Sequence, residues 1–322
     1  LKAPFENLDP LAGLQELERL ETRYVPLEDR HMPILASLPR LTILSVMDAM
    51  LTDDFCRHLI GTKTLERLTL FKCRSFTGTG LESLSPESLQ SISLSDSVVT
   101  DASLALLPRF KHLTELHLTN LPITDAVLPS LNELRELTYL KFMTSGGGSG
   151  VMKVTLEGLD KLKSLKKLSR LGWTFTPGRM PEEAAVIARV FPDLAGLDTT
   201  SLPFSAEDIA AFSACRRLTY LGLVGPGAND AAVQGVLRLL ALEVLSMKIS
   251  VKITDAGLSA LAAHKSLQLI VCNDAPDITD AGLVSLAKLK PLQRLEVTNC
   301  AKLTTAGIEA FKKARPDVKL TR

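Results

Sequence analysis

Histidine and cysteine are the side chains best suited to metal binding or nucleophilic chemistry, and this chain holds five of each. A zinc site usually needs an HExxH helix or cysteines in close pairs. No two of these residues stand at such a spacing. We therefore predict no metal ion, no cofactor and no disulfide framework. The ten residues are His31, His58, His112, His117, His264, Cys56, Cys73, Cys215, Cys272 and Cys300.

Two further patterns could suggest catalysis or ligand binding, and neither is complete. The glycine run at residues 146–150 is followed by Val151, whereas a phosphate-binding loop continues with Lys and Ser or Thr. It also lacks the GxSxG pattern of a nucleophile elbow. The recurrent Thr-Asp pairs lack the alternating carboxylates of a calcium loop. The sequence therefore predicts a protein that is not an enzyme.

Composition limits the remaining classes. The 322 residues are 46% apolar and 23% charged, and the formal net charge is +1. Because nucleic-acid-binding domains usually carry a clear basic excess, we predict no nucleic-acid partner. No apolar run approaches the roughly 20 residues of a membrane span. The chain begins with Leu1, which leaves two compartments open: the cytoplasm, or export after loss of an N-terminal segment.

A repeated pattern, L-x-x-L-x-L, organises the chain and has to be recognised before any other feature. We predict a single domain over residues 1–322, with a partial repeat at 1–16, twelve repeats over 17–317 and a strand fragment at 318–322. The twelve repeats begin at Leu17, Leu41, Leu65, Leu89, Leu113, Leu137, Leu168, Leu194, Leu218, Leu242, Leu267 and Leu292.

Each repeat has two halves with different periods. In residues 113–118, LTELHL, apolar residues alternate with polar ones, which predicts a short half-buried strand. The second half, as in TDAGLSALAAH, has apolar residues at three- and four-residue spacing, which predicts a helix. Thr124, Thr254 and Thr279 are expected to cap such helices, with the following Asp favoured in the first turn. The sequence thus predicts an α/β fold: a right-handed βα solenoid, curved like a horseshoe, with a parallel concave sheet and convex helices.

These units resemble leucine-rich repeats, of the ribonuclease-inhibitor-like and cysteine-containing type. The ITDAGL segments at 253–258 and 278–283 resemble repeats of many bacterial proteins and of the substrate-receptor part of F-box proteins. The Asn or Cys typical of the ninth position is present as Cys73 and Cys300, but Leu121 and Ala275 replace it elsewhere. No F-box is visible. The resemblance implies an interaction module, so we expect a monomer that binds a protein partner.

The third, fifth and seventh residues of each repeat should point away from the core and form the concave surface. Exposed apolar groups often mark partner sites, and Tyr and Arg are favoured anchors. On that basis we predict the following partner-binding residues: Tyr220, Val224, Val244, Leu269 and Val271 near one end, Ile43, Met47 and Phe71 near the other, and Tyr139 and Arg170 between them.

The insertion at Thr144–Lys153 is a further candidate for the binding side, because insertions confined to one face often belong to it. Two alternatives to a protein-binding scaffold stay open. The chain could be a regulatory or targeting domain of a larger enzyme or receptor. It could also bind carbohydrate or a cell surface, although the sequence offers few exposed aromatic residues for a sugar-binding groove.

Overall fold

The computed structural model describes residues 8–25, 27–144, 152–175, 179–199 and 203–322. They form a 13-stranded parallel sheet in which the strands follow one another in sequence order. The fold is therefore α/β, a leucine-rich-repeat solenoid. The strands are β1 (Arg19–Arg23), β2 (Ile43–Met47), β3 (Arg67–Phe71), β4 (Ser91–Ser95), β5 (Glu115–Thr119), β6 (Tyr139–Met143), β7 (Arg170–Trp173), β8 (Gly196–Asp198), β9 (Tyr220–Val224), β10 (Val244–Lys248), β11 (Leu269–Asn273), β12 (Arg294–Thr298) and β13 (Lys319–Thr321).

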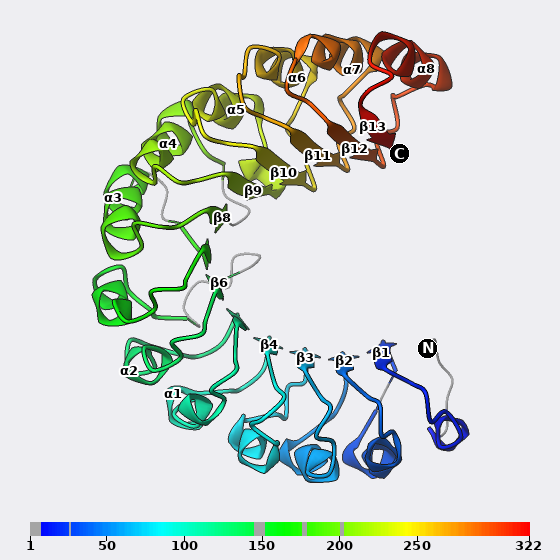
Figure 1. Cartoon of the computed structure of the whole chain (residues 1–322), viewed down its shortest axis with the longest axis vertical. Coiled ribbons are helices and arrows are strands. Elements are labelled where there is room, and N and C mark those ends of the chain that lie inside the picture. Colours follow the sequence, from blue (N-terminus) through cyan, green and yellow to red (C-terminus); the bar gives the residue numbers. More distant parts are fainter. Residues whose placement is uncertain (1–7, 26, 145–151, 176–178, 200–202) are drawn as a thin grey trace. The chain divides into compact units, whose positions relative to one another are not determined.

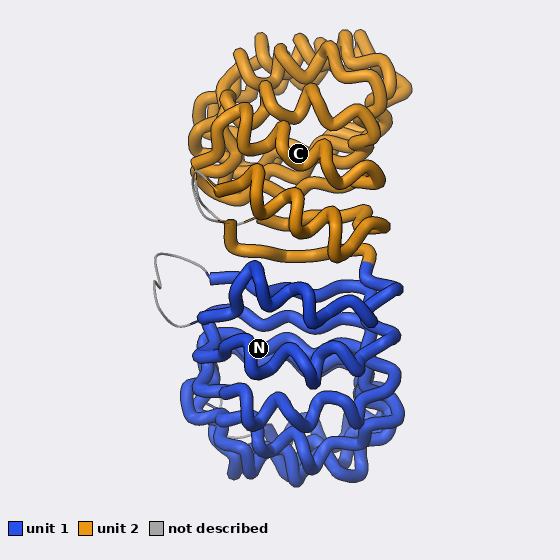
Figure 2. Tube along the Cα trace, turned by 90° about the vertical axis from the view of Figure 1, so that its left-hand side faces the viewer, with its two compact units in different colours: residues 1–168 blue, residues 169–322 orange. Residues whose placement is uncertain are grey.

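The chain is divided into two compact units, Leu1–Leu168 and Ser169–Arg322 (Figure 2). The first unit holds β1–β6 and the second holds β7–β13. In each unit the strands line one side and the helices lie on the other (Figure 1). The core fills the space between these two layers.

The alternation predicted for the strands is confirmed. In β5, Leu116 and Leu118 are fully buried, while Glu115, His117 and Thr119 are half-buried on the opposite face. The buried apolar residues of neighbouring repeats share one register: Leu116 of β5 pairs with Ile92 of β4 and with Leu140 of β6. Trp173 is also buried, as its inward position in the repeat predicts.

The helical side is less regular than the sequence suggests. In the first unit several repeats form 3₁₀ helices rather than α-helices, at Asp29–Ser37, Asp53–Leu59, Thr79–Ser83 and Glu157–Leu162. Pro33 lies inside the first of these and removes one backbone donor. The α-helices are α1 (Asp101–Leu104), α2 (Leu128–Leu131), α3 (Met180–Val190), α4 (Ala206–Ala210), α5 (Asp230–Val236), α6 (Asp255–Leu261), α7 (Asp280–Ser285) and α8 (Thr305–Ala314).

A left-handed residue follows most strands and turns the chain away from the sheet. This conformation is costly for side chains other than Gly, Asn and Asp. Gly225 therefore suits the turn after β9, whereas Ile249, with φ of 55°, is an unfavourable choice after β10. The other positions of this kind are Tyr24, Asp48, Lys72, Asp96, Asn120, Asp274 and Asn299.

Candidate functional site

The cysteines have no nucleophilic setting. All five are buried and none forms a disulfide. Burial raises the pKa of Cys73 and Cys215 to about 11 and that of Cys272 to about 12, so these thiols stay protonated at neutral pH. Cys300 Sγ lies 3.6 Å from the carbonyl oxygens of both Cys272 and Thr298. Cys300, the ninth residue of its repeat, is therefore buried against the backbone of its own strand and the strand before it.

Metal ligands are not gathered at any point in the described part of the chain. No group of three or more His, Cys, Asp or Glu residues there is arranged to hold an ion. None of the helices among the same residues has the length and apolar character that crossing a membrane requires.

Aspartates at the helix starts, most of them in Thr-Asp pairs, instead connect neighbouring repeats. Asp255 Oδ1 accepts a bond of 2.8 Å from the Thr279 backbone N–H, and its Oδ2 accepts one of 2.6 Å from the Thr279 hydroxyl. Thr279 in turn caps α7, as predicted, by accepting from the Ala281 N–H at 3.2 Å. We call each such pair a carboxylate rung. The rungs are Asp29–Thr52, Asp53–Thr77, Asp101–Thr124, Asp125–Thr155, Asp230–Thr254, Asp255–Thr279 and Asp280–Thr304.

The pKa of Asp53 shows how the hydrogen bonds of one rung stabilise its carboxylate. Burial alone would raise the pKa of Asp53, but hydrogen bonds from Thr77, Gly80 and Thr79 outweigh burial and hold that pKa below its ordinary value. Sequence reasoning assigned these aspartates only to helix starts. Their bonds to the next repeat were missed, although the regular spacing of Thr-Asp pairs was a visible signal.

On the second unit, three of the predicted apolar residues form one row across neighbouring strands. Tyr220, Val244 and Leu269 lie in register on β9, β10 and β11. Val271 lies two residues beyond Leu269 on the same face, and Val224 ends β9. All five side chains lie on the outward face of the sheet. Each is half-buried, because neighbouring residues cover part of it. We call these five residues the β9–β11 patch.

A polar cluster holds the Tyr220 side chain in place at the edge of this patch. The Arg170 guanidinium lies 4.1 Å from the centroid of the Tyr220 ring. The same guanidinium donates two bonds to Asp198, from Nε at 2.8 Å and from Nη2 at 2.9 Å. The Tyr220 hydroxyl donates to Asp198 Oδ1 at 3.2 Å. Burial, together with the charge of Asp198, raises the pKa of Tyr220.

Glycines next to this cluster make room for it. A Cβ atom at Gly222 would lie 2.5 Å from Asp198 Oδ1 and 3.1 Å from the Tyr220 hydroxyl oxygen. A Cβ atom at Gly196 would lie 3.1 Å from Arg170 Cγ. Asp198 and these glycines were not among the predicted site residues. An acidic residue on a glycine-flanked strand was the signal that could have identified them.

On the first unit, the predicted residues are less closely gathered. Met47 and Phe71 lie in register on β2 and β3, both half-buried. Ile43 stands at the other end of β2, where its register partner is Arg67 rather than Phe71. Tyr139 packs edge-on against His117, with ring centroids 4.4 Å apart. The structure therefore brings Met47 and Phe71 together and leaves Ile43 and Tyr139 apart from them.

Most of the predicted Thr144–Lys153 insertion, residues 145–151, lies outside the described residues.

This chain is similar to known proteins in its fold. A scan against protein-family models and a search of curated proteins found no match to the sequence. Among solved structures, that of the TLR13–ssRNA13 complex matches with a TM-score of 0.56 and 17% identity, over 89% of this chain and 43% of that chain. The yeast Rad7–Elc1 complex matches at 0.47 and 16%, over 91% and 83%. An internalin of Listeria monocytogenes matches at 0.42 and 15%, over 98% and 76%.

Proposed function

We propose that this chain is a non-catalytic, protein-binding scaffold whose partner docks on the concave face of the second unit. The observation that carries the proposal is the β9–β11 patch with Tyr220 fixed at its edge. The burial of all five thiols is unfavourable for thiol catalysis and supports a binding role.

Tyr220 has the properties of an interface anchor. Tyrosine and arginine are enriched among the residues that dominate binding energy. Because Arg170 and Asp198 already hold the Tyr220 ring, a partner does not have to immobilise that side chain. Val244 and Leu269 continue the apolar row over the next two strands, which lie about 4.8 Å apart. This row is suited to the centre of an interface of standard size, about 800 Å² per partner.

Met47 and Phe71 form the corresponding candidate contact on the first unit. They are the apolar pair that the strand register brings together there. We assign them a secondary role, because the Lys72 ammonium group lies 5.3 Å from the Phe71 ring centroid and already occupies part of its surroundings. Ile43 and Tyr139 are more isolated candidates on this unit.

The test is a charge substitution in the middle of the patch. We would make Leu269→Glu with Val271→Glu, and use Ser93→Glu with Ser95→Glu on β4 as the matched control. All four positions are half-buried and point away from the core. Affinity purification followed by quantitative mass spectrometry would then identify proteins captured by the wild type.

For a partner that docks on the patch, the first variant should lose at least tenfold in affinity, about 1.4 kcal/mol, while the control keeps it. Thermal melts establish that both variants stay folded. Equal affinity of the folded patch variant and the wild type for every captured protein would refute the proposed surface.

A further inference from the structure

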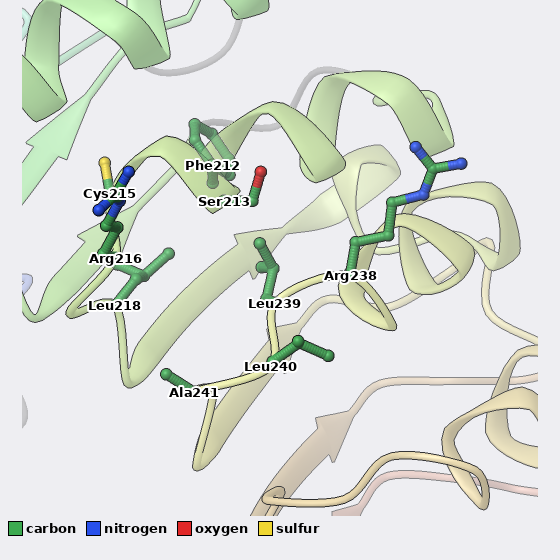
Figure 3. Close-up of a pocket in the computed structure, with 9 residues that line it drawn as sticks. All are labelled: Phe212, Ser213, Cys215, Arg216, Leu218, Arg238, Leu239, Leu240 and Ala241. Carbon is green, nitrogen blue, oxygen red and sulfur yellow. The ribbon is translucent and has the colours of Figure 1, made fainter.

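A second surface lies where the helix of one repeat returns to the next strand, in the loops that precede β9 and β10. It contains a cavity of about 240 Å³ between residues 212–218 and 238–241 (Figure 3). The apolar side chains at its base are Phe212, Leu218 and Leu239, which are buried. Arg216 and Arg238 stand at opposite ends of it (Figure 3). This volume is below the range of about 300–1,000 Å³ that is usual for small-molecule sites, and it suits one or two side chains of a partner.

Leu240 is the residue that marks this surface as unusual. It is 77% exposed, which is a high value for a large apolar side chain. The equivalent position, two residues before each L-x-x-L-x-L pattern, is Lys or Arg in seven of the twelve repeats and no other large aliphatic residue occurs there. The equivalents in order are Gln15, Pro39, Lys63, Glu87, Lys111, Arg135, Lys166, Pro192, Arg216, Leu240, Lys265 and Lys290.

The two repeats that flank Leu240 are basic at this position. Arg216 precedes it and Lys265 follows it, and both side chains are exposed. Neither has an ion pair or a hydrogen bond within the described residues. Because β9, β10 and β11 pair in register, the three loops are neighbours, spaced by roughly the 4.8 Å between strands. Across the three neighbouring loops, the edge thus presents first a positive charge, then an apolar side chain and then a second positive charge.

The backbone at Leu240 is held in place. The Ser266 hydroxyl lies 2.7 Å from the Leu240 carbonyl oxygen and 2.9 Å from the Leu242 carbonyl oxygen. The Leu242 N–H donates to the Leu239 carbonyl oxygen at 2.9 Å. Since the loop is fixed, binding there requires little ordering of the backbone.

We propose that this edge, formed by Arg216, Leu240 and Lys265 with the adjacent cavity, docks an acidic peptide segment of a protein partner. The segment would present one large apolar side chain between carboxylates. The apolar side chain would cover Leu240 and enter the cavity, and the carboxylates would pair with the flanking cations. This surface is separate from the β9–β11 patch, so either proposal can fail without the other.

The test uses the purified chain and three fluorescein-labelled peptides in anisotropy titrations. The first peptide carries one phenylalanine between two pairs of glutamates in a Gly-Ser frame. In the second, serine replaces the phenylalanine; in the third, lysines replace the glutamates. We expect the first peptide to bind at least tenfold more tightly than either of the others.

Variants of the chain then locate the binding. Leu240→Lys restores the residue type of the neighbouring repeats, and at an exposed position it should leave the thermal melt unchanged. It should weaken the first peptide at least tenfold. Arg216→Glu with Lys265→Glu should weaken both glutamate peptides. Ile60→Lys is the matched control on the first unit, where Ile60 is 58% exposed, and it should change nothing.

Three results would overturn the proposal. The first is no binding of the phenylalanine peptide at millimolar concentration. The second is equal binding of the serine and phenylalanine peptides, which would mean that charge alone attracts them. The third is a folded Leu240→Lys variant that binds the phenylalanine peptide as the wild type does.

Discussion

Removal of a carboxylate rung should change the effect of a nearby glycine substitution from harmful to favourable. Asp230 Oδ1 accepts from the Thr254 N–H at 2.9 Å, and Oδ2 accepts from the Thr254 hydroxyl at 2.6 Å. Gly257, in the first turn of α6, faces the same carboxylate. A Cβ atom there would lie 2.3 Å from Asp230 Oδ1, which is too close for any real contact. The remaining contacts of that Cβ atom are 2.8 Å to Ile253 Cδ1 and 3.2 Å to Asp230 Cγ, both side-chain atoms.

The magnitudes follow from these contacts. A hydrogen bond to a charged group contributes about 1.5–3 kcal/mol. The lower end applies to each of the two Thr254–Asp230 bonds, because both residues are half-exposed. Asp230→Ala should therefore lower the free energy of unfolding by about 2–3 kcal/mol. Gly257→Ala should displace the carboxylate and lose the same bonds, while its better helix propensity returns about 1 kcal/mol. Its net cost should be about 1–2 kcal/mol.

The double variant loses the bonds only once. It should be about as stable as Gly257→Ala alone, and hence more stable than Asp230→Ala by up to about 1 kcal/mol. Urea unfolding followed by circular dichroism measures all four proteins. Gly235→Ala is the control, because its Cβ atom would meet the Ala206 backbone oxygen at 2.3 Å, and Asp230→Ala cannot relieve that contact. If Gly257→Ala is equally harmful with and without Asp230, the two residues do not compete for space and the reasoning is wrong.

Further predictions concern the core, a turn and a buried histidine, each measured by urea unfolding. Leu116→Ala should cost about 2–5 kcal/mol, and Glu115→Ala at most about 1 kcal/mol because its ion pair is partly exposed; similar costs would contradict the assigned register. Ile249→Asn should stabilise the chain by about 0.5–1 kcal/mol, since φ is 55° and the side chain is 53% exposed; a loss of stability would contradict the strain. Burial lowers the pKa of His264, against the opposing effect of two backbone carbonyls, so the unfolded chain binds the proton more readily and stability should fall as pH drops through 6.5. His264→Gln should flatten this dependence, and an unchanged slope would contradict the cause.

The strands and their buried faces could be predicted from sequence because alternation of apolar residues fixes which side of a strand is inside. Leu116 and Glu115 follow that rule. The caps Thr254 and Thr279 were predicted by a different signal, a Thr-Asp pair before a helical period, and both cap their helices. The alternation rule predicts on which face of the strand a side chain lies, but not how much of that side chain is exposed to solvent. Gly222 has the outward position that was predicted for it, yet it is buried because Asp198 and Tyr220 cover it.

The remaining features depend on contacts between repeats, which a single repeat does not reveal. The rung from Asp230 to Thr254 needs the spacing of two neighbouring helices, and the polar cluster on Tyr220 crosses three strands. The 3₁₀ helices of the first unit also depart from the helices that the periodicity predicts; in Asp29–Ser37, Pro33 removes one backbone donor. Leu240, by contrast, could have been found by aligning the repeats and looking for the residue that differs.

The carboxylate rungs also have a mechanical consequence for the second unit. From Asp230 to Thr304, four consecutive repeats are joined twice, by strand pairing in one layer and by three rungs at the helix starts in the other. Repeats that are bonded to one another in both layers resist bending, whereas repeats bonded only in the sheet bend easily. This stretch should therefore behave as a stiff plate, and a partner that binds it has to match its curvature rather than reshape it.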